Sequence, residues 1–208
     1  HGETHWNKEQ RYQGHRDSPL TLNGIAQAQA VARNLLLHIK SAKGYEVWSS
    51  PIGRAHQTAA IICEILKYPY QDICLDERLK ERHFGYWEGL TLSDVKLKYK
   101  ESFNNSRCDP WGYRIPGGGE NYEDVRIRLE QWLSNRIQDK PIIAIMHSGS
   151  GRVLRNYYTS ADRSKILAYN EVQTAGFILE HGKEQEIGPS PDLLAESGCD
   201  SEGIRIVI

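Results

Sequence analysis

Three side chains that can do chemistry stand at the ends of short segments. His1 begins the run HGETHWN, Arg54 follows SSPIG, and His147 follows the apolar run IIAIM. A neutral imidazole is a nucleophile, and a guanidinium binds oxyanions through paired N–H groups. Brought together, these side chains would form an anion site that contains a nucleophile.

The segments between these residues predict alternating helices and strands. Thr21 is a candidate N-cap for a helix whose apolar residues recur at helical spacing through Leu36. Residues 142–146 form a bare apolar run, which is typical of a central strand buried on both faces. We further expect short strands over 45–48, within 71–79, over 174–181 and over 203–208, and helices over 52–66, after Gly119 and after His147.

This alternation predicts an α/β domain over residues 1–208 with a mostly parallel sheet. In such sheets, ligands bind at the carboxyl ends of the strands, where loops and helix N-termini meet. If HGET also follows a strand, His1, Arg54 and His147 converge on one rim. We expect residues 100–119 to form an inserted solvated loop or lid, and the residues from about 182 to form a surface extension.

The composition is that of an ordinary globular protein. Of 208 residues, 39% are hydrophobic and 25% charged, and the net charge is −1, so nothing global favours nucleic acid or a membrane surface as a partner. The four cysteines lie far apart without a CxxC pair, which favours reduced thiols and a cytoplasmic protein. No metal-binding or dinucleotide motif is present, so we expect chemistry without a metal or cofactor.

Six blocks, in order, resemble the motifs of the histidine phosphatase superfamily, in its phosphoglycerate mutase-like branch. The similarity extends from residue 1 to about residue 180. The blocks are HGETHWN, GHRDSPLTLNGIAQA, SSPIGRAHQTA, LKERHFGYWEGLT, PGGGENYEDVRIR and IIAIMHSGSGRVLR.

The resemblance implies a three-layer sandwich and a two-step phosphoryl transfer through phosphohistidine. His1 would be the nucleophile, and Glu81 would be the proton donor and then the base. Arg54 would hold the phosphoryl oxygens in fork geometry, with hydrogen bonds added by His147 and Asn7. The implied phosphate and pocket residues are Asn7, Gln13, Gly14, Arg54, His147 and Ser148.

The first block departs from the family pattern in one respect. The family has an arginine directly before the histidine and an apolar strand before that, and neither precedes His1 in this sequence. We expect the protein to carry more residues before His1. In an alternative interpretation, the segment GIRIVI at 203–208 supplies a replacement for that strand, although an ordinary closing strand is the preferred expectation.

Several functions and residue roles stay open. A phosphatase acting on a small phosphorylated substrate is preferred over a mutase, because mutases of this family have a longer insertion with paired arginines and YRIPGGGE offers only Arg114. The segment ERHFG resembles the mutase version of its motif, and a non-catalytic phosphoryl-binding protein is a third alternative. Glu77 is the alternative to Glu81. The resemblance also makes a homodimer possible.

The remaining aromatic and basic residues have either packing or substrate-contact interpretations. For the other histidines (His5, His15, His38, His56 and His181) we expect structural or merely exposed positions. His83, Tyr86 and Trp87 are either substrate contacts or packing residues. The inserted segment carries Arg107, Trp111, Tyr113 and Arg114.

Overall fold

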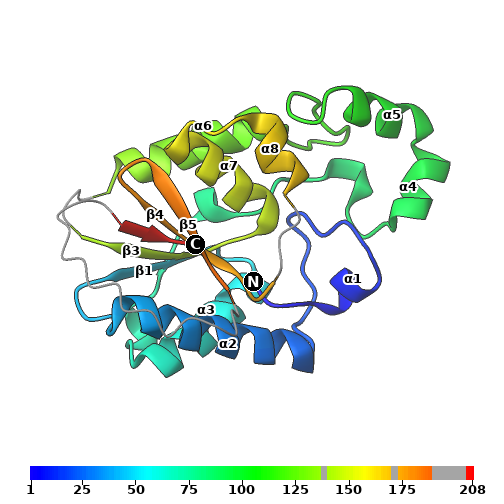
Figure 1. Cartoon of the computed structure of the whole chain (residues 1–208). Helices are drawn as coiled ribbons and strands as arrows, with labels where there is room; N and C mark the ends of the chain where they lie inside the picture. Colours follow the sequence, from blue (N-terminus) through cyan, green and yellow to red (C-terminus); the bar gives the residue numbers. More distant parts are fainter. Residues whose placement is uncertain (137–139, 170–172, 189–204) are drawn as a thin grey trace.

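A six-stranded sheet lies between two layers of helices in the computed structural model, which describes residues 1–136, 140–169, 173–188 and 205–208 (Figure 1). The strand order is β2-β1-β3-β6-β4-β5. The strands β2, β1, β3 and β6 run parallel to one another, and β4 is antiparallel to both β6 and β5. The strands are β1 (Glu46–Ser49), β2 (Cys74–Leu75), β3 (Ile142–Ile145), β4 (Gly176–Glu180), β5 (Lys183–Ile187) and β6 (Arg205–Val207). The predicted α/β fold with a mostly parallel sheet is confirmed.

Side chains alternate along β3 between the two helical layers. Ile143 and Ile145 pack into the cluster formed with α2 (Leu22–Ile39) and α3 (Gly53–Leu66). Ala144 faces the opposite cluster, with residues of α6 (Tyr122–Ser134) and α7 (Ser148–Thr159). The short helix α8 (Arg163–Ala168) contacts α7. The strand is buried on both faces as predicted, and the three-layer arrangement is confirmed (Figure 1).

The predicted helix starts depend on local capping. The Thr21 side chain accepts the Gly24 N–H at 3.0 Å and begins α2. Asn121 begins α6 with a capping box, in which Asn121 Oδ1 accepts the Asp124 N–H and the Asp124 carboxylate accepts the Asn121 N–H. These contacts satisfy amides that the first helical turn leaves without partners. They fix where α2 and α6 enter the two layers.

The expected solvated loop over 100–119 is wrong, because part of that segment is helical. A capping box between Thr91 and Asp94 starts α4 (Leu92–Lys98), and α5 (Lys100–Cys108) follows it. Val95 is fully buried with Trp87 and Ile115 in a third cluster. Beyond α5, Trp111 is buried in the α6–α7 cluster.

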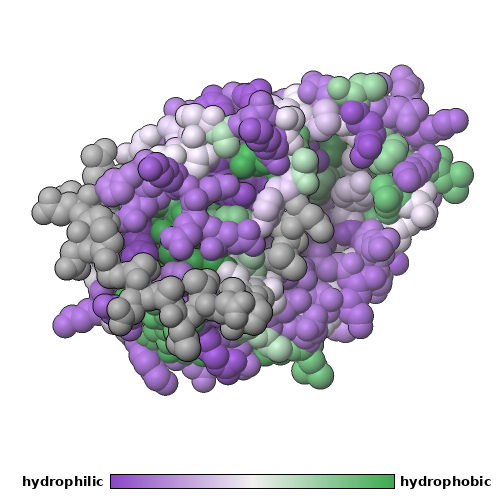
Figure 2. All heavy atoms as spheres, viewed as in Figure 1, coloured by the Kyte–Doolittle hydropathy of each residue, from purple (hydrophilic) through white to green (hydrophobic). Residues whose placement is uncertain are grey.

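The α4–α5 pair projects from one end of the molecule (Figure 1). Figure 2 shows a mostly hydrophilic face with hydrophobic side chains over this pair, where Leu97 is 82% exposed. The other short helices of the described residues are α1 (His5–Lys8), η1 (Tyr70–Asp72), η2 (Glu77–Leu79) and η3 (Gly85–Trp87).

The C-terminal segment differs most from expectation. Residues 183–187 are β5, an exposed strand paired with β4, rather than an extension outside the fold, whereas residues 189–204 lie outside the described residues. β6 is inserted between β3 and β4 at the centre of the sheet, where Ile206 is fully buried. An ordinary closing strand was therefore the wrong expectation. The alternative, in which GIRIVI replaces the strand expected before HGET, agrees with the central position of residues 205–207.

Candidate active site

The contacts of His1 determine which ring nitrogen carries the proton. His1 Nδ1 lies 2.8 Å from the carbonyl oxygen of Gly2. A carbonyl oxygen only accepts, so this contact requires a hydrogen on Nδ1, and a neutral ring then has its lone pair on Nε2. Arg54 Nε donates to that Nε2 at 3.3 Å. In this geometry, Nε2 of His1 keeps the lone pair that a nucleophile requires.

The loop that carries His1 fits closely against its neighbours. The backbone nitrogen of His1 donates to the carbonyl of Met146 at 3.2 Å, just beyond β3. The Gly2 N–H donates to Thr58 Oγ1 at 3.2 Å, and a Cβ on Gly2 would lie 2.2 Å from the Gly24 carbonyl oxygen. Only glycine fits there. The loop is therefore held between the end of β3 and helices α2 and α3.

Arg54 is held in the first turn of α3 with 1% of its surface exposed. Its Nη1 donates to the Arg16 carbonyl at 2.7 Å and its Nη2 to the Gly14 carbonyl at 2.8 Å, and Asp17 Oδ1 lies 3.2 Å from Nη1. Burial lowers the pKa of Arg54, and the charges of Glu81 and Asp17 oppose that shift. An arginine stays charged in proteins, so a fixed cation lies beside His1 with its Nε edge toward the ring.

His147 completes the predicted convergence. Its ring centroid lies 5.1 Å from that of His1, in a T-shaped arrangement, and its Nε2 lies 2.8 Å from Ser50 Oγ. Within the described residues, the buried Nδ1 atom has no hydrogen-bond partner. Burial first, and the charge of Arg54 second, lower the pKa of His147 well below its usual value. The ring is therefore neutral at physiological pH, with a nitrogen available for a ligand.

The N-terminus of α7 binds the Glu81 carboxylate. Oε2 accepts the Gly149 N–H at 3.0 Å and Oε1 accepts the Ser150 N–H at 3.1 Å. A Cβ on Gly149 would lie 2.3 Å from Oε1, so this approach requires glycine. The alternative acid, Glu77, has a side chain that is 73% exposed and pairs with Lys80 on the surface. The geometry supports Glu81 over Glu77.

All the predicted site residues line one cavity of about 660 Å³: His1, Asn7, Gln13, Gly14, Arg54, Glu81, His147 and Ser148. Three of them also hold the loop. Asn7 Oδ1 accepts the Thr4 N–H at 3.0 Å, Gln13 Oε1 accepts the Thr4 hydroxyl at 3.0 Å, and the Gly14 carbonyl accepts from Arg54. Gly14 has φ +56°, and a Cβ there would lie 2.1 Å from Glu88 Oε1.

His83, Tyr86 and Trp87, for which the sequence allowed either packing or substrate contact, do not line this cavity. Trp87 is 2% exposed and belongs to the third cluster, whereas Tyr86 is 61% exposed. His83 Nδ1 accepts the Gly85 N–H at 2.9 Å. These contacts support packing and loop-holding roles for Trp87 and His83.

Sequence reasoning missed a second set of polar residues around the cavity. Ser50 contacts His147, and Thr58 contacts Gly2. His15 and Arg128 contact the Glu81 carbonyl, and Glu120 accepts the His83 N–H. For Glu120, the glutamate of GGGEN, its place in a motif block was a usable signal. In the part of the chain that the structure describes, no group of three His, Cys, Asp or Glu side chains could hold a metal ion. Among the same residues, no helix is long and apolar enough to cross a membrane.

Comparisons with known proteins identify relatives of this chain. The chain is 37% identical over 168 residues to phosphoglycerate mutase-like protein 4 of Arabidopsis thaliana, covering 77% of this chain and 68% of that protein. It is 33% identical over 162 residues to a metal-independent phosphoserine phosphatase of the same plant, covering 76% and 64%. The chain thus spans about two thirds of the length of these two relatives.

A solved structure shares the fold. It is that of Bacillus stearothermophilus YhfR, with a TM-score of 0.72 and 29% identity over 91% of this chain and 93% of that chain. The sequence profile of the histidine phosphatase superfamily (branch 1) matches residues 1–187. Because this match covers most of the chain, the chain belongs to the histidine phosphatase superfamily, branch 1.

Proposed function

We propose that this protein is a metal-independent phosphatase that hydrolyses a small phosphomonoester through a phosphohistidine on His1. The observation that carries the proposal is the contact of His1 Nδ1 with the Gly2 carbonyl, which leaves the Nε2 lone pair directed at Arg54 Nε. The phosphatase among the relatives, named for phosphoserine, supports the same class of reaction.

The first step transfers the phosphoryl group to His1. The Nε2 lone pair forms a bond to phosphorus while the bond from phosphorus to the leaving oxygen breaks. The Glu81 carboxyl group, protonated at this stage, gives its proton to that oxygen and becomes a carboxylate. The Gly149 and Ser150 N–H groups that contact it then stabilise its negative charge.

The second step returns the enzyme to its starting state. The Glu81 carboxylate takes a proton from water, and the water oxygen attacks phosphorus. The bond between phosphorus and Nε2 breaks, and its electron pair returns to His1. Inorganic phosphate leaves, and Glu81 is again protonated, so one carboxyl group serves as acid and then as base.

Arg54 and His147 stabilise the phosphoryl group during both steps. Negative charge spreads over the equatorial oxygens in the transition state, so positioned N–H donors contribute most of the catalysis. Arg54 Nη1 and Nη2 already bond main-chain carbonyls, so the oxygens approach the edge that carries Nε. A hydrogen on His147 Nδ1, with Nε2 accepting from Ser50, would give a second donor.

A mutase is the second candidate, because another relative is a phosphoglycerate mutase-like protein. The position of Arg114 favours hydrolysis instead. Arg114 Nη2 pairs with Asp124 at 2.5 Å, its side chain is 58% exposed, and it does not line the cavity. It therefore does not offer a cation to a second anionic group of a substrate in that cavity.

Activity of paired variants tests the proposal. The wild-type protein should release phosphate from p-nitrophenyl phosphate in the presence of EDTA, and His1→Asn should abolish this activity. His181→Asn is the matched control, because His181 is exposed in a turn with φ 49°, a conformation that asparagine tolerates. Turnover that persists in His1→Asn would overturn the mechanism, and a folded wild-type protein without turnover would favour the non-catalytic alternative. Phosphoryl transfer to a second substrate molecule, without release of phosphate, would favour the mutase.

A further inference from the structure

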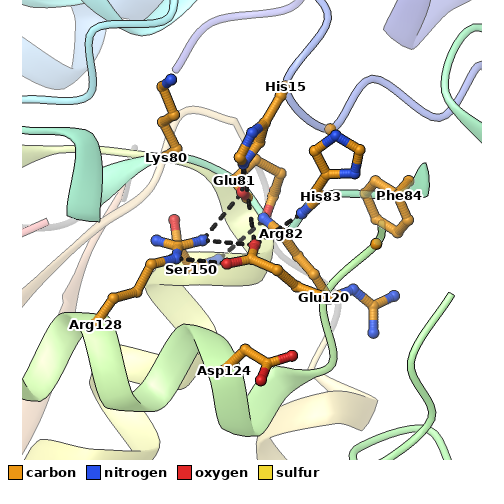
Figure 3. Close-up of polar contacts among 12 residues, drawn as sticks. His15, Lys80, Glu81, Arg82, His83, Phe84, Glu120, Asp124, Arg128 and Ser150 are labelled. Carbon is orange, nitrogen blue, oxygen red and sulfur yellow. Dashed lines mark hydrogen bonds and ion pairs between the residues drawn. The ribbon is translucent and has the colours of Figure 1, made fainter. Parts of the chain in front are cut away.

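Glu81 belongs to a segment, residues 78–84, that begins in η2 and continues as a loop, and its main chain is held on both sides of Glu81; we call it the acid loop (Figure 3). Arg128, on α6, donates through Nη1 to the Arg78 carbonyl at 2.5 Å and through Nη2 to the Glu81 carbonyl at 3.0 Å. Glu120, before α6, accepts the His83 N–H at 2.9 Å. The acid loop is thus attached to α6 before and at Glu81, and to the segment that precedes α6 after Glu81.

Arg128 and Glu120 also hold each other. Arg128 Nε donates to Glu120 Oε1 at 3.0 Å, and Nη2 lies 3.1 Å from Oε2. Burial alone would raise the pKa of Glu120, but the hydrogen bonds and charge of Arg128 outweigh it and the net pKa is lowered. Glu120 is therefore ionised at neutral pH. One planar guanidinium contacts a carboxylate and two carbonyls, which a lysine ammonium cannot reproduce.

A second donor reaches the same carbonyl of Glu81. His15 Nε2 lies 2.9 Å from it, so His15 carries its hydrogen on Nε2. Burial is the main cause that lowers the pKa of His15, which keeps this ring neutral at physiological pH. The Glu81 carbonyl thus accepts from both His15 and Arg128, while the Glu81 carboxylate accepts from the first turn of α7. Both ends of the residue are fixed (Figure 3).

We propose that Arg128 and Glu120 are positioning residues for proton transfer at Glu81, and that they act by fixing the acid loop between α6 and the cavity. The proposal rests on the proposed function, since it concerns the acid of that reaction. Neither side chain lines the cavity, so both act through the loop rather than on the substrate. A misplacement of about 1 Å at a reacting group can cost roughly 10²-fold in rate.

The leaving group distinguishes this role from general stabilisation of the fold. An alkyl phosphate releases an alkoxide, which needs the proton of Glu81, whereas p-nitrophenyl phosphate releases a phenolate that departs without one. The parameter kcat/KM reports the step that forms phosphohistidine. Its ratio between the two substrates, measured on one sample, does not depend on the fraction of protein that is folded.

Arg128→Met and Glu120→Gln are the test variants, and Arg126→Met is the control. Arg126 lies on the same helix, and within the described residues it pairs with Glu123 and Glu130 on the surface, at 2.7 and 2.6 Å. We expect kcat/KM for the alkyl phosphate to fall about tenfold or more beyond any change for p-nitrophenyl phosphate in both test variants, a part of the roughly 10²–10⁴ that a general acid contributes. The control should keep the wild-type ratio.

An unchanged substrate ratio in Arg128→Met and Glu120→Gln would overturn the positioning role, whether or not the absolute rates fall. Arg128→Lys adds a check, because it keeps the charge but not the planar geometry, and it should resemble Arg128→Met. Failure of the proposed function itself gives a different result, since the wild-type protein would then show no turnover with either substrate.

Discussion

Arg54 Nε lies 3.3 Å from His1 Nε2, and the same guanidinium donates to the carbonyls of Gly14 and Arg16. The Arg54 guanidinium therefore holds the segment that contains Gly14 and Arg16 and at the same time faces the His1 ring. A phosphoryl group on Nε2 would replace this contact, and its oxygens would then be the acceptors that Arg54 Nε faces.

Arg54→Lys should lower kcat by roughly 10²–10³, because an ammonium cannot face the phosphoryl group and also bond both carbonyls. Arg33→Lys, on the exposed surface of α2, should leave kcat unchanged. Steady-state kinetics with p-nitrophenyl phosphate measure both variants. Equal kcat values for wild type and Arg54→Lys would show that the guanidinium geometry is not used.

The stability of the protein should depend on the protonation of His147. Burial and Arg54 lower the folded-state pKa of His147, so below the unfolded-state value of about 6.5 the unfolded chain binds the extra proton. The contribution of neutral His147 to the free energy of unfolding is therefore complete above that pH. It falls with decreasing pH until the folded-state pKa is reached, by up to about 1.4 kcal/mol per pH unit.

Urea unfolding of wild type and His147→Gln between pH 5 and 7.5 measures this effect. In the variant, the slope of the unfolding free energy against pH should fall by the contribution of about one proton. The contributions to that slope from His15 and His38, whose pKa values are also lowered, should remain. His181→Asn should keep the wild-type slope. Identical slopes for wild type and His147→Gln would mean that His147 is not held neutral in the fold.

Gly149→Ala should displace the acid, because the new Cβ would lie 2.3 Å from Glu81 Oε1. We expect kcat to fall about tenfold or more, which is a part of the rate enhancement that general acid–base catalysis contributes. Gly151→Ala, in the same helix, places its Cβ 4.0 Å from Met146 Sδ and should keep its activity and gain a little helix stability. A fully active Gly149→Ala enzyme would argue against the observed position of Glu81.

The central position of β6 predicts that a substitution in β6 lowers the free energy of unfolding much more than one in the edge strand β5. Ile206 is fully buried and pairs with Ile142 and Leu179, so Ile206→Ala should lower the free energy of unfolding by about 2–5 kcal/mol. Gln185→Ala, in the exposed edge strand β5, should change it by less than about 0.5 kcal/mol. Equal, small losses in urea unfolding would place residues 205–207 outside the core.

Local sequence signals predicted the parts of the site that depend on local structure. The apolar run of β3 leading to His147, and the turn before Arg54, each lie where a strand ends and a helix begins. Because parallel strands end at one edge of a sheet, these signals were enough to bring Arg54 and His147 together. The place of His1 was predicted only on the assumption that HGET also follows a strand, and in the structure the Met146 carbonyl just beyond β3 holds it there.

The parts that could not be predicted depend on contacts between distant segments. The pattern of GIRIVI indicates a strand but not its neighbours, so its position between β3 and β4 was not readable. The polar composition of α5 hid a helix that Phe103 anchors to the third cluster. The contacts of Arg128 with the acid loop arise only where α6 passes that loop.

The most direct test of the account is to find the phosphoryl group on the enzyme. Glu81→Gln, mixed with p-nitrophenyl phosphate and quenched in alkali, should accumulate phosphohistidine, because the phenolate leaves without an acid but water attacks slowly without a base. Peptide mass spectrometry should place the group on the ring of His1, and His1→Asn should carry none. Turnover by the wild-type enzyme with the phosphoryl group on another residue, or on none, would contradict the account.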